Sequence, residues 1–252
     1  MHVYAGLTGT FHFWAVTFAD ESSGEVSAWA WDFDSDGVGG SFRTQGSQDT
    51  SSGRGAARME VDMNSEQSES PVKVLRAEHQ VILRVVRVLG KLMDRFEQAG
   101  EFAEAPLAKC VEFLRLFADA CHHGKEEDLL FPVLESRGIP RDGGPIGVML
   151  YEHQIGRGLT KDMAGALTDA RTGDAARTRF CKAARQYVDL LTDHIYKEDN
   201  ILFTMGDRMM NPDDQAALGT KFCAVNCRAF EGRRREELQQ IADELEAECG
   251  HG

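Results

Sequence analysis

Two stretches of the chain carry a histidine and a glutamate at a spacing that suits metal binding. His122 is followed four residues later by Glu126, and His194 is followed at the same distance by Glu198. Residues at i and i+4 lie one turn apart on the same face of an α-helix, so each imidazole and its carboxylate point toward one place. The two stretches also align as copies of each other. The sequence therefore predicts two metal-binding pairs on two helices.

A second duplication accompanies the first. The triplet Glu-His-Gln contains His79 in one copy and His153 in the other, and each copy precedes one histidine–glutamate pair. A single His-x-x-x-Glu pair occurs often by chance. Two pairs in register, each preceded by the same triplet, form a specific pattern that places candidate ligands on four separate segments.

Four long helices should position these residues. Apolar side chains recur at steps of three and four along four segments, which are separated by proline, glycine and asparagine. All six candidate ligands lie on these apolar stripes, which would face inward in an all-α, antiparallel up-down four-helix bundle. Pro132 is expected to kink or end the second helix. The four helices are expected over residues 71–99, 106–132, 145–171 and 175–210.

Six polar groups in an apolar core require a partner for their charge. Burying them uncompensated costs several kcal/mol per charge, and a pair of metal ions would neutralise them directly. A hydrogen-bonded core histidine explains one such residue but not the whole set. Nitrogen and oxygen ligands disfavour a sulfur-rich structural zinc site and suit iron, with manganese as the second choice. The candidate ligands are His79, His122, Glu126, His153, His194 and Glu198.

Each of the two glutamates can bridge a pair of ions, which leaves two histidines for each ion. If each ion takes roughly six ligands, a solvent oxygen bridge still leaves about one open position per ion. An open position admits a small molecule. Two ferrous ions side by side can give two electrons to O₂ or bind NO.

The order of these residues resembles the hemerythrin family, specifically its HHE cation-binding branch. The resemblance covers roughly residues 71–210 and includes the run Glu-Glu-x-Leu-Leu-Phe-Pro that starts at Glu126. It implies an up-down four-helix bundle with a non-haem di-iron centre. The family's ligand positions match the six residues named above.

The chain also departs from the family pattern. Oxygen-carrying hemerythrins have a fifth histidine one turn after the third-helix ligand, where this chain has Arg157, and an aspartate at a longer spacing in place of Glu198. The fifth histidine of the family's di-iron repair proteins has no counterpart that the sequence identifies. Those proteins also have a cysteine-bearing N-terminal domain, whereas residues 1–70 contain no cysteine. These departures argue against pure oxygen transport and against iron–sulfur repair.

Four acidic or histidine neighbours of the ligands have weaker assignments. His123 and Glu127 each follow a predicted ligand, so on an α-helix they point about 100° away and are expected at the surface or behind the ligands. Glu78 and Glu152 either accept a proton from a ligand histidine across the bundle or lie at the surface.

Composition limits which cellular compartment and which partners we expect. The chain has 252 residues and a net charge of −13. No basic patch predicts a nucleic-acid partner, and no apolar run approaches the roughly 18 residues of a membrane span. The first residues lack the features of a signal peptide, so we expect a cytoplasmic location. The six cysteines suit free thiols in a reducing compartment, although Cys223 and Cys227 lie one turn apart and could form a redox pair.

The chain is expected to have three parts: an acidic N-terminal extension (1–70), a metal-binding bundle (71–210) and a C-terminal helical extension (211–252). The N-terminal extension is expected to be largely disordered, because residues 37–58 are rich in Gly, Ser, Thr and Gln. Short strands are conceivable around its tryptophans, with no evident partner sheet. An alternative is that residues 1–58 are an artefact of start-site assignment.

Asp32 begins a run that resembles the start of a calcium loop, but Arg43 stands at the twelfth position, where such loops have glutamate. Two helices are expected after the bundle and on its outside, near residues 213–230 and 233–248.

Together these features predict a non-haem di-iron protein that binds or reacts with O₂ or NO, for sensing, storage or detoxification, with a redox partner where it reacts. One alternative is an enzyme, a di-iron oxidase or peroxidase-like protein. Another is an iron–sulfur-centre repair or iron-handling protein. A third is a partner-binding module in which residues 213–252 relay the state of the metal.

Overall fold

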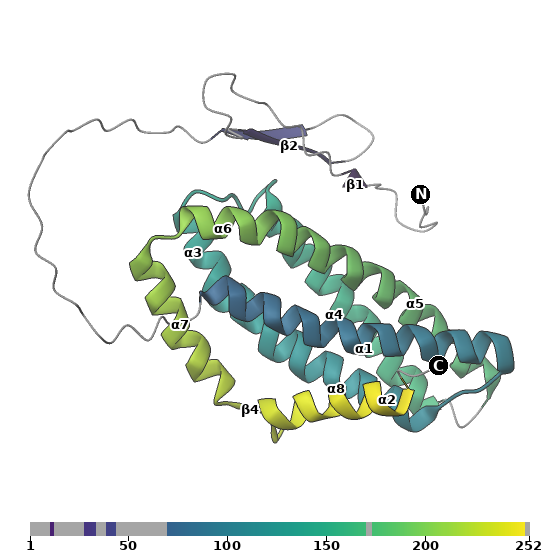
Figure 1. Ribbon diagram of the computed structural model, residues 1–252. Helices are drawn as coiled ribbons and strands as arrows, with labels where there is room; N and C mark the ends of the chain where they lie inside the picture. Colours follow the sequence, from purple (N-terminus) through teal and green to yellow (C-terminus); the bar gives the residue numbers. More distant parts are fainter. Residues whose placement is uncertain (1–10, 13–27, 34–38, 44–69, 170–172, 250–252) are drawn as a thin grey trace, which may run out of the picture. The chain divides into compact units, whose positions relative to one another are not determined.

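The computed structural model describes residues 11–12, 28–33, 39–43, 70–169 and 173–249. The chain divides into two units, Met1–Asn64 and Ser65–Gly252. The second unit is the predicted all-α bundle (Figure 1). Its first helix, α1 (Pro71–Ala99), has the predicted bounds and ends at Gly100, whose φ of 70° is the left-handed conformation that glycine adopts at helix ends.

The second helix of the bundle is continuous from Glu104 to Ser136 but changes its winding along the way. Its parts are α2 (Glu104–Phe113), the π-helical segments η1 (Leu114–His123) and η2 (Glu126–Leu130), and α3 (Phe131–Ser136). Pro132 was expected to kink or end the helix. It does not end the helix, because it lies in the first turn of α3, where a missing N–H is tolerated. Just before it, the N–H of Phe131 donates to the carbonyl oxygen of Glu126, five residues back, and closes a wider turn.

The remaining helices complete the bundle and extend it. They are α4 (Pro145–Asp169), α5 (Asp174–Lys197), the π-helical segment η4 (Glu198–Leu202), α6 (Phe203–Met209), α7 (Pro212–Asn226) and α8 (Arg235–Cys249). A two-stranded hairpin, β4 (Ala229–Phe230) with β5 (Arg233–Arg234), joins α7 to α8. Asn211 ends one helix and starts the next, because its side chain accepts a hydrogen bond from Asp214 N–H in a capping box.

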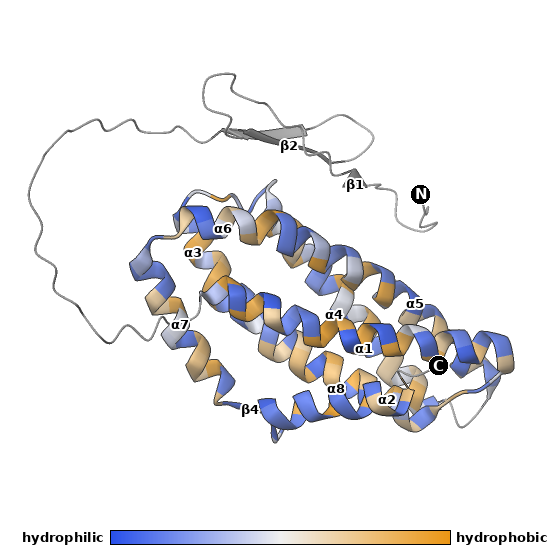
Figure 2. Ribbon diagram, viewed as in Figure 1, coloured by the Kyte–Doolittle hydropathy of each residue, from blue (hydrophilic) through white to orange (hydrophobic). Residues whose placement is uncertain are grey.

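The core lies between α1, α2, η1, α4 and α5, and α8 contributes to it as well. Figure 2 shows hydrophobic and hydrophilic residues interleaved along each bundle helix, as amphipathic helices require. The sequence predicted the last helix packed on the outside of the bundle, and α8 packs there through one face, on which Leu238, Ala242 and Leu245 are fully buried in the main apolar cluster. Among the described residues, no helix combines the length and the apolar character needed to span a membrane.

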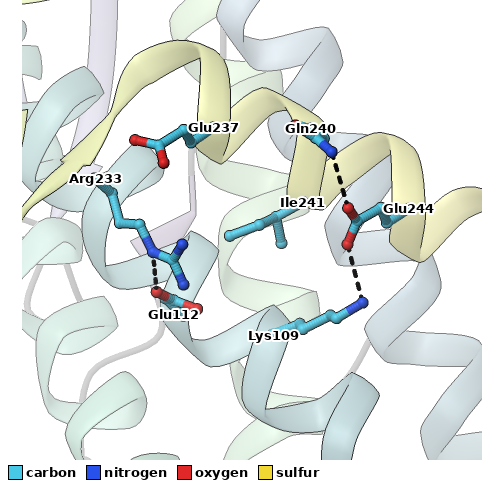
Figure 3. A pocket seen from close by; sticks show the side chains of 7 residues that line it. All are labelled: Lys109, Glu112, Arg233, Glu237, Gln240, Ile241 and Glu244. Atoms are coloured by element: carbon cyan, nitrogen blue, oxygen red, sulfur yellow. Dashed lines mark hydrogen bonds and ion pairs between the residues drawn. The ribbon is translucent and has the colours of Figure 1, made fainter.

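Ion pairs hold α8 along the flank of α2. Lys109 contacts Glu244 at 3.0 Å, and Arg233 contacts Glu112 at 2.8 Å (Figure 3). A pocket between these elements is therefore lined largely by paired charges. Its lining consists of Lys109, Glu112, Arg233, Glu237, Gln240, Ile241 and Glu244.

The first unit contains a small antiparallel sheet with the order β1–β2–β3. Its strands are β1 (Phe11–His12), β2 (Ala28–Phe33) and β3 (Gly39–Arg43). The sequence indicated strands here but no partners, and it predicted disorder over residues 37–58, of which Gly39–Arg43 in fact form β3. Positions 34–37 of the calcium-like run and residues 44–69 lie outside the described residues.

Candidate metal centre

All six predicted ligands meet in the core of the bundle. His79 comes from α1, His153 from α4 and His194 from α5, while Glu126 and Glu198 begin η2 and η4. Each of these residues, and His122 in η1, is at most 1% exposed. Four helices that are far apart in sequence therefore deliver nitrogen and oxygen ligands to one dry site.

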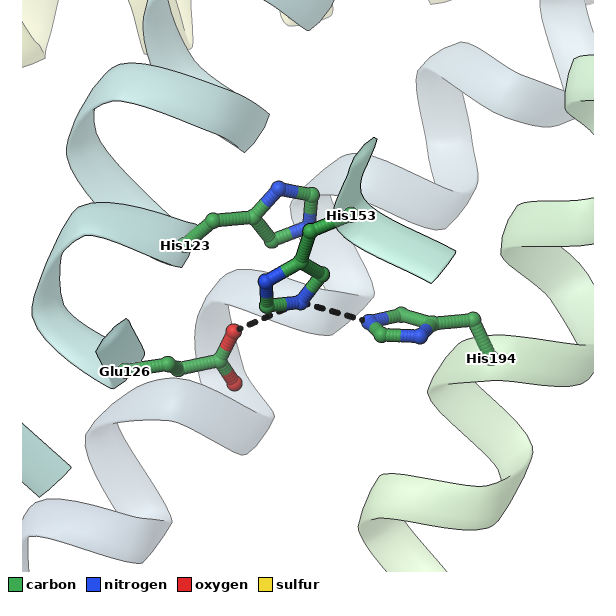
Figure 4. A group of neighbouring side chains, drawn as sticks. All are labelled: His123, Glu126, His153 and His194. Carbon is green, nitrogen blue, oxygen red and sulfur yellow. Dashed lines mark hydrogen bonds and ion pairs between the residues drawn. The ribbon is translucent and has the colours of Figure 1, made fainter. Parts of the chain in front are cut away.

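The ligand atoms form two groups that share one carboxylate. The three-imidazole position consists of His123, Glu126, His153 and His194, whose ligand atoms all lie within 4.8 Å of one another (Figure 4). The two-imidazole position consists of His79, His122, Glu126 and Glu198 under the same limit. Because Glu126 belongs to both groups, it is placed to bridge two ions.

Glu198 also contacts an imidazole of each position. Its Oε2 lies 3.2 Å from His79 Nε2 and 3.2 Å from His194 Nε2. In the same core, His122 Nε2 lies 3.4 Å from Glu126 Oε1, and His153 Nε2 lies 3.5 Å from Glu126 Oε2. Both carboxylates thus lie between the two halves of the ligand set, which is the arrangement that two bridging glutamates need.

Six of the donor atoms fit a metal because no hydrogen-bond partner satisfies them. Among the described residues, both carboxylate oxygens of Glu126 and Glu198 are buried without a hydrogen-bond partner, and so are Nε2 of His79 and Nε2 of His122. Buried polar atoms without partners are rare in folded proteins, since each costs about 1–3 kcal/mol. Their convergence on two points is the fit expected of a binuclear site with nitrogen and oxygen ligands.

His123 is the ligand candidate that the sequence interpretation misplaced. It is only 4% exposed, and its ring stacks on that of His153 at a centroid distance of 3.8 Å. The prediction assumed 100° per residue, whereas η1 is π-helical and turns through a smaller angle per residue, so His122 and His123 both face the core. The available signal was the doubled histidine itself, because the second copy of the motif has Ile195 at this point.

A carboxylate stands behind each histidine of the two predicted pairs. Glu78 Oε2 lies 3.0 Å from His122 Nδ1, and Glu152 Oε2 lies 2.9 Å from His194 Nδ1. An ionised carboxylate can only accept, so each Nδ1 carries the proton and each Nε2 keeps its lone pair for a metal. Of the two alternatives for Glu78 and Glu152, the structure shows the contact across the bundle.

The other two predicted histidines are supported in the same way. His153 Nδ1 lies 2.6 Å from Glu127 Oε1, and His79 Nδ1 lies 2.8 Å from Asp199 Oδ1. Glu127 and Asp199 each directly follow a glutamate ligand. The duplicated motif therefore encodes both the ligands of one helix and the carboxylate that orients the histidine of another.

Cations neutralise these outer carboxylates. Lys125 pairs with Glu78 and Lys197 pairs with Glu152. Arg157 donates from Nη2 to Glu127 at 2.7 Å and from Nε to Asp119 at 2.8 Å. Arg157 therefore acts behind the three-imidazole position, where it holds the partner of His153 in place.

The matched histidines have opposite pKa shifts in the metal-free core. Burial and the charge of His79 lower the pKa of His122 to about 3. Burial alone would also lower the pKa of His194, but the charge of Glu198 and the hydrogen bond to Glu152 outweigh it and raise the pKa to about 9. The pKa of His79 is also raised against the effect of burial, by Asp199 and Glu198, so without metal positive charge gathers on the two imidazoles that contact Glu198.

The two central carboxyl groups also have opposite pKa shifts. Burial and the charge of Glu198 raise the pKa of Glu126 well above its ordinary value. Burial alone would raise the pKa of Glu198 too, but His194 and His79 hold it well below the ordinary value. Two buried carboxylates this close require cations before both can ionise.

Two tyrosines near the ligands in sequence belong to neither ligand group. Tyr151 and Tyr196 are 45% and 66% exposed. Cys121, which precedes His122, is fully buried.

Comparison with known proteins agrees with this geometry. The family model for the Hemerythrin HHE cation binding domain matches residues 70–206. An uncharacterised protein of Mycobacterium tuberculosis is 30% identical over 131 residues, which cover 51% of this chain and 50% of that protein. The iron-sulfur cluster repair protein YtfE of Dickeya chrysanthemi is 37% identical over 86 residues, 32% of this chain and 38% of the relative. The protein DnrN of Neisseria gonorrhoeae, also named for iron-sulfur cluster repair, is 35% identical over 88 residues, 32% and 54% respectively.

The match covers more than half of the chain, and the chain belongs to the hemerythrin HHE cation-binding domain family. It spans about half the length, or less, of the curated relatives that it matches. The family and the buried ligand groups together define a metal-binding helical bundle.

Proposed function

We propose that this chain holds two iron ions in the core of the bundle and that the resulting centre binds or reacts with O₂ or NO. The observation that supports the proposal most directly is the set of buried, unpartnered donor atoms on His79, His122, Glu126 and Glu198. Iron suits this mixture of imidazole and carboxylate inside a bundle, and a pair of ferrous ions can supply two electrons to a diatomic molecule.

The protein's own residues have three tasks in this proposal. The six predicted residues and His123 supply the donor atoms. The outer carboxylates fix the protons on the outer imidazole nitrogens, so that the inner nitrogens face the metal. The apolar surroundings, such as Phe203, which stacks on His79 at 5.3 Å, exclude water from the centre.

The two positions leave different room for an external ligand. If both glutamates bridge and each gives one oxygen to each ion, the three-imidazole position has five protein donors and the two-imidazole position has four. We therefore infer that the diatomic ligand binds at the two-imidazole position. Sensing, storage and detoxification all use this step, and a redox partner is needed only where the ligand is consumed.

Anaerobic loading with ferrous iron tests the proposal. We expect two irons per chain and a lasting change in the visible absorbance when O₂ or NO is added. One iron per chain, or two irons with no response to either gas, would contradict it. Continued consumption of O₂ in the presence of a reductant would instead favour the oxidase or peroxidase-like alternative.

A second candidate function is iron–sulfur centre repair or iron handling. Two observations favour it: relatives named as iron-sulfur cluster repair proteins match 32% of the chain, and His123 supplies a fifth imidazole that the sequence did not reveal. A repair protein should pass its iron to a partner with a damaged cluster, whereas a gas-binding protein should keep it. Iron content of the chain before and after incubation with such a partner distinguishes the two.

A further inference from the structure

Two of the six cysteines differ from the other four in exposure. Cys110, Cys121, Cys181 and Cys249 are buried, and burial raises the pKa of the Cys121 thiol and of the Cys181 thiol to about 11. Cys223 and Cys227 are exposed. Oxidants react with accessible thiols, so these two cysteines are the ones open to modification.

The exposed cysteines form a pair at the end of α7. Cys227 N–H donates to Cys223 O at 3.1 Å, so the last helical turn joins them and their side chains lie on one face. That face is opposite to the one that Leu218, Phe222 and Val225 bury. The β4–β5 hairpin follows directly and leads into α8. The pair therefore lies at the joint between α7 and the rest of the C-terminal extension.

Residues on both sides of the β4–β5 hairpin contact Lys125 and Glu78, the charged pair behind His122. Asn226 Oδ1 accepts a hydrogen bond from Lys125 Nζ at 2.9 Å, and Lys125 Nζ lies 5.6 Å from the centre of the Phe222 ring. Beyond the hairpin, Arg235 Nη2 lies 3.4 Å from Glu78 Oε1. Asn226 directly precedes Cys227, so a shift of the last turn of α7 would alter the contact that Asn226 makes with Lys125.

We propose that Cys223 and Cys227 are a modification site, a thiol pair that hydroperoxides oxidise to a disulfide, and that this bond loosens the contacts of the joint with Lys125 and Glu78. One thiolate attacks the peroxide, breaks its O–O bond and becomes a sulfenic acid, with water as the product when hydrogen peroxide is the oxidant. The second thiol then displaces a second water and forms the S–S bond. The pair loses two electrons and two protons, and the peroxide gains both.

The disulfide deforms the turn because helical geometry does not match it. Cβ atoms one helical turn apart are about 5–6 Å apart, whereas a disulfide needs about 3.5–4.5 Å. Closing this gap strains the Cys227 N–H to Cys223 O bond at the helix end, where fraying costs least. Asn226 and the hairpin must then move relative to Lys125.

The consequence for the metal rests on the function proposed above. Glu78 orients His122, and Lys125 with Arg235 neutralises Glu78. Changes behind a ligand typically cost 10–100-fold in metal affinity. Oxidation of the thiol pair should therefore weaken the two-imidazole position and leave the three-imidazole position intact.

The first experiment needs no metal. The full-length, metal-free chain is treated with hydrogen peroxide, and its intact mass, its disulfide map and its amide hydrogen exchange are measured. We expect loss of the mass of two hydrogen atoms, a Cys223–Cys227 link that dithiothreitol reverses, and faster exchange over residues 222–238. Cys223→Ser should abolish all three, and Cys110→Ser should abolish none. Absence of the link, or a link without faster exchange, would overturn the proposal.

The second experiment uses the iron-loaded chain and a ferrous chelator, with diamide as the thiol oxidant to avoid reaction of peroxide with iron. One of the two irons should leave about tenfold faster or more after oxidation. Asn226→Ala should speed the same iron without any oxidant, and Cys223→Ser should be insensitive to diamide. Unchanged release from an oxidised, fully loaded chain would disprove the link to the metal, whereas failure to load iron at all would count against the proposed function and leave the first experiment decisive.

Discussion

The two halves of the bundle use one arrangement twice, and they differ in two places. In each half a Glu-His-Gln triplet on one helix faces a His-x-x-x-Glu pair on the next, and a lysine neutralises the glutamate of the triplet. The halves differ first at His123, which faces the centre where the second copy has the buried residue Ile195. This single difference gives one ligand group three imidazoles and the other two. The duplication supplies two ligand groups, and the deviation makes them unequal.

The second difference lies behind the ligands. Lys125 and Glu78 are at most 1% exposed because the C-terminal extension covers them, whereas the matching Lys197 and Glu152 side chains are 21% and 13% exposed. The covered pair belongs to the two-imidazole position. The half that is poorer in imidazoles is therefore the half with the more protected outer charges.

The largest expected effect comes from comparing the two glutamate ligands. Glu126 belongs to both ligand groups, whereas Glu198 belongs to the two-imidazole group and reaches the other through its contact with His194. We predict that Glu126→Ala loses both irons, whereas Glu198→Ala loses chiefly the iron of the two-imidazole position. Iron analysis of the purified variants measures this. Glu127→Ala is the control and should retain both irons at saturating iron; equal loss in Glu126→Ala and Glu198→Ala would contradict this difference between the two glutamates.

The next effect concerns the lysines. Lys125→Ala removes the buried cation paired with Glu78 and leaves only the longer contact with Arg235, so it should lower the free energy of unfolding by about 3–5 kcal/mol. Lys197→Ala opens a partly exposed pair and should cost about 1 kcal/mol or less. Chemical denaturation of the metal-free variants gives both values. Similar losses for the two lysines would mean that the cover by α7 and α8 has no energetic consequence.

The matched histidines should give the metal-free protein opposite pH dependences. The pKa of His122 is lowered from 6.5 to about 3, so its contribution to stability is lost as the pH falls below 6.5. The pKa of His194 is raised from 6.5 to about 9, so its contribution is present below pH 6.5 and is lost as the pH rises through 9. Each slope is at most about 1.4 kcal/mol per pH unit.

Denaturation of the metal-free chain at a series of pH values checks this prediction. Taken together, the contributions of these two histidines are greatest near pH 6.5. Relative to the unaltered chain, His194→Gln should reduce the alkaline loss and His122→Gln should reduce the acid loss. Stability that rises from neutral to alkaline pH would show that His194 is neutral in the folded core.

The smallest expected effect is at Arg157. It holds Glu127 against His153 and also pairs with Asp119. Arg157→Ala should weaken iron binding at the three-imidazole position by about tenfold, while Arg157→Lys restores part of the loss. Competition with a chelator measures the affinity. Selective loss of the other iron would show that Arg157 supports the two-imidazole position instead.

The sequence predicted the bundle and the convergence of six ligand candidates because both follow from α-helical periodicity. His123 was missed because that periodicity fails in η1, where the π-helical winding brings two consecutive histidines inward. Lys125 could not be placed from local pattern either. Its contact with Asn226 spans 101 residues, and only the docking of α7 and α8 makes it a buried residue. The strand partners of the N-terminal unit were unpredictable for the same reason, since sheet pairing depends on non-local contacts.

The asymmetry of the centre is tested most directly by Mössbauer spectroscopy of the iron-loaded protein. Three imidazoles on one ion and two on the other predict two distinct iron environments in equal amounts. Removing one imidazole in His123→Ala should make the two environments nearly alike, and Ile195→Ala should leave them distinct. A single environment in the unaltered protein, or two environments that His123→Ala does not change, would contradict the assignment of His123 and with it the account of an asymmetric di-iron centre.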